Sequence, residues 1–589
     1  MDSLLEFGIS DVLIHDDIWA ERIGTVKNKS IFACLQKCKD TSRINNFLMT
    51  GKTVGEEHVG ASYNDSDVYK ILEAIAYILA SERDQCLESN ANEIISDIIV
   101  AQEECGYLNT KYSTKMGTAF HDFNEHEMYN AGHLIEAGIA YYEATGEKAL
   151  LNAGIRFAEY LMKIFGPGKR EWIPGHQEIE LALAKLSQIM KDNRYLIFAQ
   201  WLIDQRGENH EEIDKNRKID REYCQDLEKP SMLKRIYGHS VRAMYMLTAM
   251  AKITRFGGKD YRQALEAVWH NITEKKMYIT GGIGSLASNE GFSDDYSLPN
   301  VDGYCETCAA VGMVFYNYEM FLQTGEGKYI DIIEREIFNG VLSAMNLEGN
   351  QFFYRNVLES DGTVTRKEWF KTACCPTQIV RFVPTIGKYI YSRSESTLFI
   401  NLFISSELKN FCHVHIKSDY PYSGQVRIVG VEVSGVKELR VRIPYWAKEV
   451  KIMQIENLQR MMIDKGFMIF SVLGEFTLEI DFGIMVDKIV TNSKVRDNQN
   501  KIALQYGPLV YCLESTDCSD YEHFALGNEQ LPLIAELPSA LGKGKSIQII
   551  NMDNGDKEAM LIPYYLWNNR GTCAMKVFLP IKADEVLYL

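Results

Sequence analysis

The amino-acid sequence predicts an α+β multidomain protein, in which one large helical domain is followed by two β-sandwich domains. The chain has 589 residues, which is too long for a single hydrophobic core. Between about residues 65 and 345, apolar residues recur at three- and four-residue spacing, as in VYKILEAIAYILA, and this spacing predicts helices. From about residue 390 onward the apolar period falls to two, which predicts strands.

The helical part contains an approximate repeat. The dipeptide Gly-His occurs at Gly132-His133, Gly175-His176 and Gly238-His239, and we expect each copy to open a helix. A fourth unit starts at Glu306, and every unit has the pattern helix, turn, helix. Helical hairpins bury their apolar faces by stacking, in an open solenoid or a closed ring. We favour the ring, because it gathers the electropositive N-termini of the inner helices and the recurring histidines around one pocket.

The β part consists of short alternating runs such as LFINLFISS, FTLEIDFGI and SIQIINMD, bounded by Gly, Asn, Asp and Pro. A segment near residues 487–500 separates two groups of these runs. We therefore predict a helical domain at residues 12–388 and two β-sandwich domains at residues 389–492 and 493–589. Residues 1–11 are a candidate addition to the first sandwich.

Charge and composition limit the classes of ligand and the locations that we expect for this protein. The formal net charge of −17 disfavours binding to nucleic acid or to an anionic membrane, because both surfaces would repel the chain. No stretch approaches the roughly 20 apolar residues of a membrane span, and the start of the chain does not resemble a signal peptide. The thirteen cysteines lack the spacing of a disulfide framework, which predicts free thiols and a cytoplasmic location. An uncharged small molecule is the expected ligand.

Two short motifs contain thiols and a carboxylate that are candidate metal ligands. Cys374 and Cys375 are adjacent in ACCPTQ, and Glu306 and Cys308 lie in YCETCAA. Three sulfurs and one carboxylate suit tetrahedral Zn²⁺, and a metal-bound thiolate stays available as a nucleophile. The spacing is not that of a zinc finger, so buried thiols beside a helix-capping Glu306 are an equal alternative.

Further candidates come from a loop and from the repeats. The long, Gly-rich loop at residues 281–304 contains Glu290 and leads directly into the thiol motif. His126, His176 and His239 lie at or near successive repeat starts and are candidate lining residues of one polar pocket. His133 lies on roughly the same helix face as His126. Tyr354, in QFFYRNVL, is a further hydroxyl donor or else a core aromatic.

The segments GGIGS, NEGF, YSLPN, YCETCAA, FFYRNVL and ACCPTQIVRF resemble glycoside hydrolase family 127, the β-L-arabinofuranosidases. The resemblance extends over nearly the whole chain. It implies an (α/α)6-barrel catalytic domain with β-sandwich domains, a homodimer, and a Zn²⁺ ion held by Glu306, Cys308, Cys374 and Cys375. It also implies the roles of nucleophile for Cys374 and general acid/base for Glu290. The residues that it implies for sugar binding are His126, His176, His239 and Tyr354, with His126 preferred to His133.

The activity implied by the resemblance is retaining hydrolysis that releases β-L-arabinofuranose, or a related furanose, from oligosaccharides or glycoconjugates. The chain departs from the family pattern in two places. Asn289 precedes Glu290 where the family usually has Gly, and the N-terminal region lacks the family's proline-histidine-glutamine segment, which contributes a sugar-contacting glutamine. Two other functions compete: a non-catalytic carbohydrate-binding protein with a structural zinc, and a sugar isomerase on the same barrel.

Overall fold

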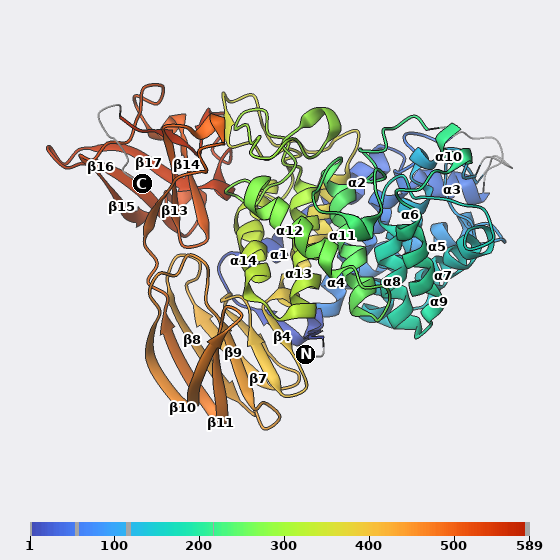
Figure 1. The fold of residues 1–589 in the computed structure, drawn as a ribbon, viewed down its shortest axis with the longest axis horizontal. Coiled ribbons are helices and arrows are strands. Elements are labelled where there is room, and N and C mark those ends of the chain that lie inside the picture. Colours follow the sequence, from blue (N-terminus) through green and yellow to red (C-terminus); the bar gives the residue numbers. More distant parts are fainter. Residues whose placement is uncertain (1–2, 53–57, 114–118, 216, 583–589) are drawn as a thin grey trace.

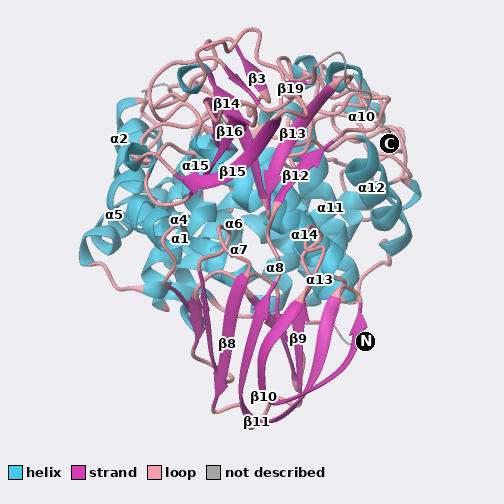
Figure 2. Ribbon diagram, turned by 90° about the vertical axis from the view of Figure 1, so that its left-hand side faces the viewer, coloured by secondary structure: helices cyan, strands magenta, loops and turns pink. Residues whose placement is uncertain are grey.

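The computed structural model describes residues 3–52, 58–113, 119–215 and 217–582. A helical domain occupies one side of the molecule, and both β regions lie on the other side, one above the other (Figure 1). Viewed from that side, strands β8 to β11 project from one end of the helical domain, and β12 to β16 cover the other end (Figure 2). None of the described helices is both long enough and apolar enough to cross a membrane. All cysteines are free thiols.

Six helices form the inner part of the helical domain. Each contacts the next, and the last contacts the first, so that the described residues form a closed ring. The helices are buried around most of their circumference, as the mainly apolar sequence of Asp65–Ser81 requires. In ring order they are α4 (Asp65–Ser81), α6 (Glu127–Thr145), α8 (Ile179–Met190), α11 (Ser240–Arg255), α13 (Thr307–Thr324) and α15 (Cys374–Phe382). The contacts among the described residues thus run in a cycle through all six inner helices.

The other helices pack outside the ring with one apolar face inward. An outer helix follows and contacts each of the first five inner helices, which accounts for the helix-turn-helix repeat. The outer partners are α5 (Gln85–Ala101), α7 (Ala149–Ile164), α9 (Asn193–Asp204), α12 (Arg262–Lys275) and α14 (Gly327–Arg335). The remaining helices are α1 (Trp19–Thr25), α2 (Ile31–Asp40), α3 (Asn45–Lys52) and α10 (Glu211–Lys215).

One detail of the repeat prediction is wrong. Gly132 and His133 do not open a helix, because α6 already begins at Glu127 with His126 as its N-cap. Gly132 is required inside α6 for a different reason. A Cβ atom there would lie 2.6 Å from the side chain of Glu178, so the glycine lets α6 approach the start of α8.

The first β region is a sheet with the order β1-β4-β5-β9-β11-β8-β7-β6-β2, in which β10 pairs with β11. All pairs are antiparallel except β5 with β9. Two strands come from the N-terminus: β1 (Leu5–Glu6) and β2 (Val12–Ile14). The others are β4 (Tyr391–Arg393), β5 (Thr397–Ile400), β6 (Ser406–Leu408), β7 (His413–Ser418), β8 (Gln425–Val431), β9 (Glu438–Arg442), β10 (Lys451–Asp464) and β11 (Phe467–Asp481).

The second β region has the order β12-β13-β14-β17-β16-β15. Because β12 pairs with β13, this sheet starts at Val486, before the predicted boundary at residue 493. A short strand of the helical domain, β3 (Glu359–Ser360), pairs with β18 and ties the two domains together. The strands are β12 (Val486–Ile489), β13 (Lys501–Tyr506), β14 (Leu509–Glu514), β15 (Gln530–Glu536), β16 (Lys545–Asn551), β17 (Lys557–Pro563), β18 (Met575–Lys576) and β19 (Leu579–Pro580). Residues 1–2 and 583–589 of the predicted domains lie outside the described residues.

Candidate active site

A cavity of about 690 Å³ lies at the end of the ring where the inner helices begin. Every inner helix contributes a lining residue at or near its first turn, as expected when helix N-termini gather at one end. These residues are Asp67 of α4, His126 before α6, His176 before α8, His239 before α11, Glu306 before α13 and Cys374 in α15. All predicted site residues line this cavity except Cys375, which lies behind Cys374 and is fully buried.

The thiols and the carboxylate named from the sequence meet in one cluster. The ligand atoms of Glu306, Cys308, Cys374 and Cys375 all lie within 4.8 Å of one another. The Sγ atom of Cys375 is 3.5 Å from that of Cys308 and 3.9 Å from that of Cys374. Oε1 of Glu306 lies 3.5 Å from Cys374 Sγ and 3.6 Å from Cys375 Sγ. The motifs, which are far apart in the sequence, are joined because α13 and α15 are neighbours in the ring.

This spacing matches what a tetrahedral metal requires. Zinc–ligand distances in proteins place two sulfurs of one zinc about 3.8 Å apart, and a sulfur and an oxygen about 3.5 Å apart. Oε2 of Glu306 is buried and has no hydrogen-bond partner among the described residues. Burial and the neighbouring Cys374 raise the pKa of Glu306 well above its usual range, so a carboxylate there needs a compensating cation. The cluster could therefore hold a metal ion.

Cys374 differs from its neighbour in position and environment. It is partly exposed to the cavity and is the first residue of α15. Because a helix N-terminus stabilises negative charge, this position favours the thiolate form of Cys374. Hydrogen bonds from the thiols of Cys308 and Cys375 lower the pKa of Cys374. The hydroxyl of Tyr354 lies 3.2 Å from its Sγ. Burial raises the pKa of the Cys375 thiol, which has no access to the cavity.

The backbone of Glu290 is held in place by a tight turn. It adopts a left-handed conformation (φ 50°) after the 3-10 helix η5 (Ala287–Asn289). Its carbonyl accepts a hydrogen bond from the backbone N–H of Ser240 at 3.1 Å. Gly291 makes this contact with the start of α11 possible, because a Cβ atom there would lie 1.8 Å from the carbonyl oxygen of Gly238. Asn289, where the chain departs from the family pattern, donates to the carbonyl of Phe292 and tightens the same turn.

Three side chains donate to the carboxylate of Glu290. The hydroxyl of Tyr223 lies 3.2 Å from Oε1, and the hydroxyl of Tyr304 lies 3.0 Å from Oε2. Nε2 of His239 is 3.5 Å from the same Oε2. The hydrogen bond from His239 lowers the pKa of Glu290, while burial opposes it, so the free protein favours the carboxylate. Proton transfer from this group requires that it first be protonated.

The three predicted histidines form one wall of the cavity. The ring centroids of His126 and His176 are 5.6 Å apart, as are those of His176 and His239. Burial and the charge of Arg242 lower the pKa of His126 to about 3, and burial also lowers the pKa values of the other two. Neutral rings can both donate and accept hydrogen bonds, which suits sugar hydroxyl groups. His239 accepts backbone N–H groups at Nδ1, so its proton is on Nε2, facing Glu290.

The structure also shows what the sequence did not reveal. His133 is not part of the cavity lining; it is fully buried, with Nδ1 3.2 Å from Oε1 of Glu178. Tyr304 and Tyr223, both donors to Glu290, were not predicted. Tyr304 could have been found, because it belongs to the same motif as Glu306. Tyr223 lies in a segment without a recognisable motif, so only the tertiary structure identifies it.

Comparison with known proteins gives two family matches. Residues 11–388 match the model of the β-L-arabinofuranosidase GH127 catalytic domain. Residues 486–580 match the model of the glycoside hydrolase family 127 C-terminal domain. Together these matches cover more than half of the chain.

Individual relatives agree with the family models. A non-reducing end β-L-arabinofuranosidase of Bifidobacterium longum subsp. longum is 32% identical over 602 aligned positions, which cover 91% of this chain and 92% of that protein. The crystal structure of a GH127 β-L-arabinofuranosidase from Geobacillus stearothermophilus T6 superposes with a TM-score of 0.90 at 33% identity, covering 97% of this chain and 100% of the other. A second GH127 β-arabinofuranosidase gives a TM-score of 0.89 at 29% identity, covering 99% and 98%.

Proposed function

The chain belongs to glycoside hydrolase family 127, and we propose that it is a retaining enzyme that releases β-L-arabinofuranose, or a related furanose, from oligosaccharides or glycoconjugates. The family match makes it a glycoside hydrolase, as the resemblance predicted. This supports the enzyme over the two alternatives, a binding protein and an isomerase. The sugar released is proposed from the activities named for the relatives.

The observation that carries the mechanism is that Cys374 and Glu290 line one cavity from different elements. A nucleophile and an acid/base on the same sugar-sized cavity are the two groups that retaining hydrolysis needs. We assign Cys374 as the nucleophile and Glu290 as the general acid/base. We assign His126, His176, His239 and Tyr354 to binding of the sugar hydroxyl groups, because all four residues line the same cavity.

The reaction then proceeds in two displacements. The thiolate of Cys374 forms a C–S bond to the anomeric carbon as the bond to the leaving oxygen breaks, and protonated Glu290 gives its proton to that oxygen. In the second step the Glu290 carboxylate takes a proton from water. The oxygen of that water bonds to the anomeric carbon as the C–S bond breaks and the thiolate is restored. Two inversions at the same carbon retain the configuration.

We further propose that Glu306, Cys308, Cys374 and Cys375 hold a Zn²⁺ ion. The ligand spacing and the unpartnered Oε2 of Glu306 support this. Bound zinc would keep the thiolates ionised at neutral pH and orient the sulfur of Cys374. The zinc content of the purified protein and its loss of activity and thermal stability on chelation test this assignment.

We also propose that the closed ring and its outer helices belong to the (α/α)6-barrel class and that the two β regions are β-sandwiches. The contacts that join the six inner helices in a cycle support the first assignment. The homodimer and the cytoplasmic location stay predictions.

NMR analysis of products tests the function. The wild-type protein should release the free sugar from an aryl β-L-arabinofuranoside, with the β-anomer appearing first. Release of the α-anomer first would contradict the two-displacement mechanism, and an epimerised but unhydrolysed sugar would contradict hydrolysis. Glu290→Gln should lower kcat/KM on a poor leaving group by about 10²- to 10⁴-fold, because the acid is lost. Its melting temperature should stay near that of the wild-type protein.

A further inference from the structure

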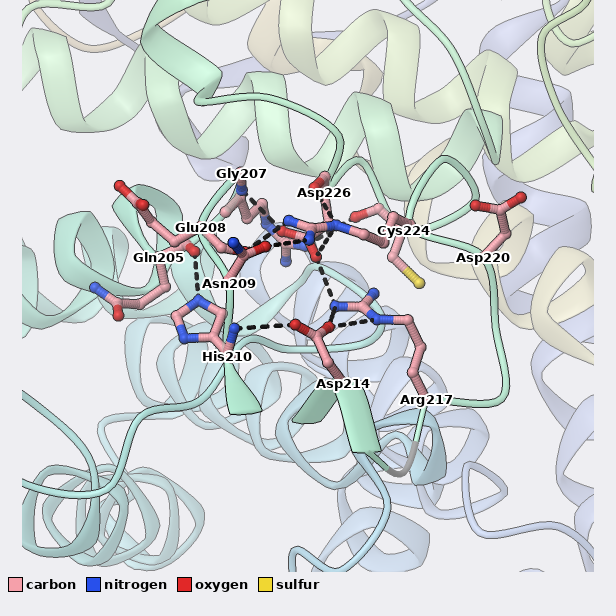
Figure 3. A network of polar contacts seen from close by, with 12 residues as sticks. Gln205, Gly207, Glu208, Asn209, His210, Asp214, Arg217, Asp220, Cys224 and Asp226 are labelled. Carbon is pink, nitrogen blue, oxygen red and sulfur yellow. Dashed lines mark hydrogen bonds and ion pairs between the residues drawn. The ribbon is translucent and has the colours of Figure 1, made fainter. Parts of the chain in front are cut away.

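The segment between α9 and the region before α11, described at residues 205–215 and 217–226, forms one side of the cavity through Ile219 and Tyr223. It contains a dense polar network, shown in Figure 3. The Asp226 side chain is at the centre of this network and is fully buried. Its Oδ1 accepts from the backbone N–H of Gly207 at 2.8 Å, and its Oδ2 accepts from Arg217 at 2.7 Å. Asp226 thus ties the two ends of the segment together.

Two further arginines hold the backbone near Asp226. Nε of Arg221 lies 3.4 Å from Asp226 Oδ2 and donates to the Asp226 carbonyl at 3.0 Å. Arg206, whose side chain is fully buried, donates to the carbonyl of Cys224 at 2.8 Å. A buried carboxylate with two guanidinium partners holds the backbone more rigidly than surface ion pairs do. The backbone on both sides of Tyr223 is therefore anchored.

Tyr223 itself is held from three directions. Its carbonyl accepts from the backbone N–H of His239 at 3.3 Å. Its ring meets the His239 ring edge-on at a centroid distance of 5.2 Å, and the Arg242 guanidinium lies 4.5 Å from the ring centroid. These contacts leave the phenol hydroxyl directed at Oε1 of Glu290, 3.2 Å away.

Within the described residues, the two oxygens of Glu290 are treated differently. Oε2 is approached by two donors, Tyr304 and His239, whereas Oε1 is approached by Tyr223 alone. The Glu290 side chain is 39% exposed, so the cavity wall alone does not fix its orientation. An acid/base group needs its reacting oxygen held in place to transfer a proton efficiently.

We propose that the part of this segment around Asp226 is a positioning device for the acid/base step, in which Asp226 and its arginines hold Tyr223 so that its hydroxyl orients Glu290. Tyr223 and Asp226 are positioning residues: they act through Glu290. This inference rests on the role of Glu290 under the proposed function. If the network were only structural, substitutions in it would destabilise the cavity wall. They would not lower kcat/KM more strongly for substrates whose leaving group needs protonation.

The test is the dependence of kcat/KM on the leaving group, measured with aryl β-L-arabinofuranosides from nitrophenyl to unsubstituted phenyl. Tyr223→Phe keeps the ring contacts and removes only the hydroxyl. We expect kcat/KM to fall about threefold to tenfold for phenyl, the loss of one hydrogen bond to a reacting group, and to change less than about twofold for nitrophenyl. An equal loss for all leaving groups, or no loss, would overturn the proposal.

A double-mutant cycle separates positioning from stability. Asp226→Asn should show the same preferential loss on the phenyl substrate, and adding Tyr223→Phe should cause little further loss, because both changes act through one hydroxyl. Independent, multiplicative losses would overturn the proposal. If Asp226→Asn does not fold, Arg217→Met weakens the same anchor and enters the cycle in its place. Asp214→Asn is the matched control: it removes an outer partner of Arg217, is 34% exposed, and should keep the wild-type leaving-group dependence.

Different results would contradict the glycosidase function and the positioning role of Tyr223. A wild-type protein that does not release the sugar, or a Glu290→Gln variant as active as wild type on the phenyl substrate, contradicts the proposed function. A wild-type protein that depends on Glu290, together with a Tyr223→Phe variant of unchanged leaving-group dependence, contradicts only the positioning role.

Discussion

The two ends of the helical ring are both rich in charged and polar side chains, but these side chains have different partners. At the catalytic end, thiols, histidines and Glu290 face a cavity of about 690 Å³. At the opposite end, a cavity of only about 80 Å³ remains, and most of the charged groups around it bind one another. Arg381 donates to Glu73 at 2.6 Å and to Glu136 at 3.0 Å, and all three side chains are almost fully buried.

The same helices supply both ends. In α15, Cys374 is the first residue and faces the catalytic cavity, whereas Arg381 lies one residue from the other end and joins the ionic network. Burial alone would raise the pKa of Glu136, but the charges of Lys185 and Arg381 outweigh it and lower that pKa. One end therefore keeps its polar atoms available for a substrate, and the other end satisfies them internally. Substitutions at the two ends should accordingly affect different properties.

The largest effect is expected for the nucleophile. Cys374→Ser should lower kcat by at least about a thousandfold, because a hydroxyl replaces the attacking sulfur. Cys375→Ser removes a neighbouring sulfur with no access to the cavity and serves as the comparison. Single-turnover kinetics and metal content should show lost chemistry in the first variant, and a change dominated by metal affinity in the second. Near wild-type turnover by Cys374→Ser would rule out the thiolate mechanism.

At the closed end, the expected loss is one of stability. Arg381→Met leaves Glu73 and Glu136 buried without their shared cation, which should cost about 3–5 kcal/mol in the free energy of unfolding. Denaturant unfolding measures the cost, and kcat of the folded fraction should stay near the wild-type value. The control combines Arg381→Met with Glu73→Gln, which should recover part of the stability, because Glu136 keeps its ion pair with Lys185. A large fall in kcat without destabilisation would contradict the division between the two ends.

Glu127 tests whether every acid near the catalytic end takes part in the chemistry. It follows His126 but binds Tyr107 and the backbone N–H of Phe120, away from the cavity. Burial raises its pKa to about 7, although those hydrogen bonds oppose the shift. Because the folded-state pKa exceeds the unfolded one, the stability contributed by the protonated group is complete below about pH 4.5 and is lost as pH rises to about 7.

Glu127→Gln should remove this dependence. Relative to the variant, the wild-type protein should lose up to about 3 kcal/mol of unfolding free energy between pH 4.5 and pH 8. Unfolding of both proteins at the two pH values gives the difference directly. A constant difference across this range would show that the carboxyl is ionised in the folded protein. The leaving-group dependence of kcat/KM should be the same in both.

The smallest effect is expected for one histidine of the cavity wall. His126 has a left-handed backbone (φ 61°), so His126→Asn is the matched substitution, since Asn tolerates that conformation. Loss of one hydrogen bond to the sugar should lower kcat/KM by about tenfold with little change in melting temperature. An unchanged kcat/KM would remove His126 from the sugar-binding residues. His133→Asn, in the buried layer below, should instead lower stability.

Much of this protein follows from local patterns in its sequence. The change of apolar period separates helices from strands, because burial of one face needs a fixed spacing of side chains. The thiols and Glu306 could be grouped because the donor types suit one metal, and Glu290 because its loop leads into the same motif. The prediction for Gly132-His133 failed because α6 starts earlier, at a left-handed residue that no apolar spacing marks.

Only the tertiary structure decided how distant segments meet. It closed the ring by placing α15 beside α4, paired β1 with β4 across most of the chain, and brought Tyr223 to Glu290 from a segment without a motif. It also lowered the pKa values of the three histidines, since burial beside Arg242 depends on neighbours far away in the sequence. Spacing along the chain specifies which face of an element is buried. The partner, charge state and orientation of a side chain depend on what packs against that face.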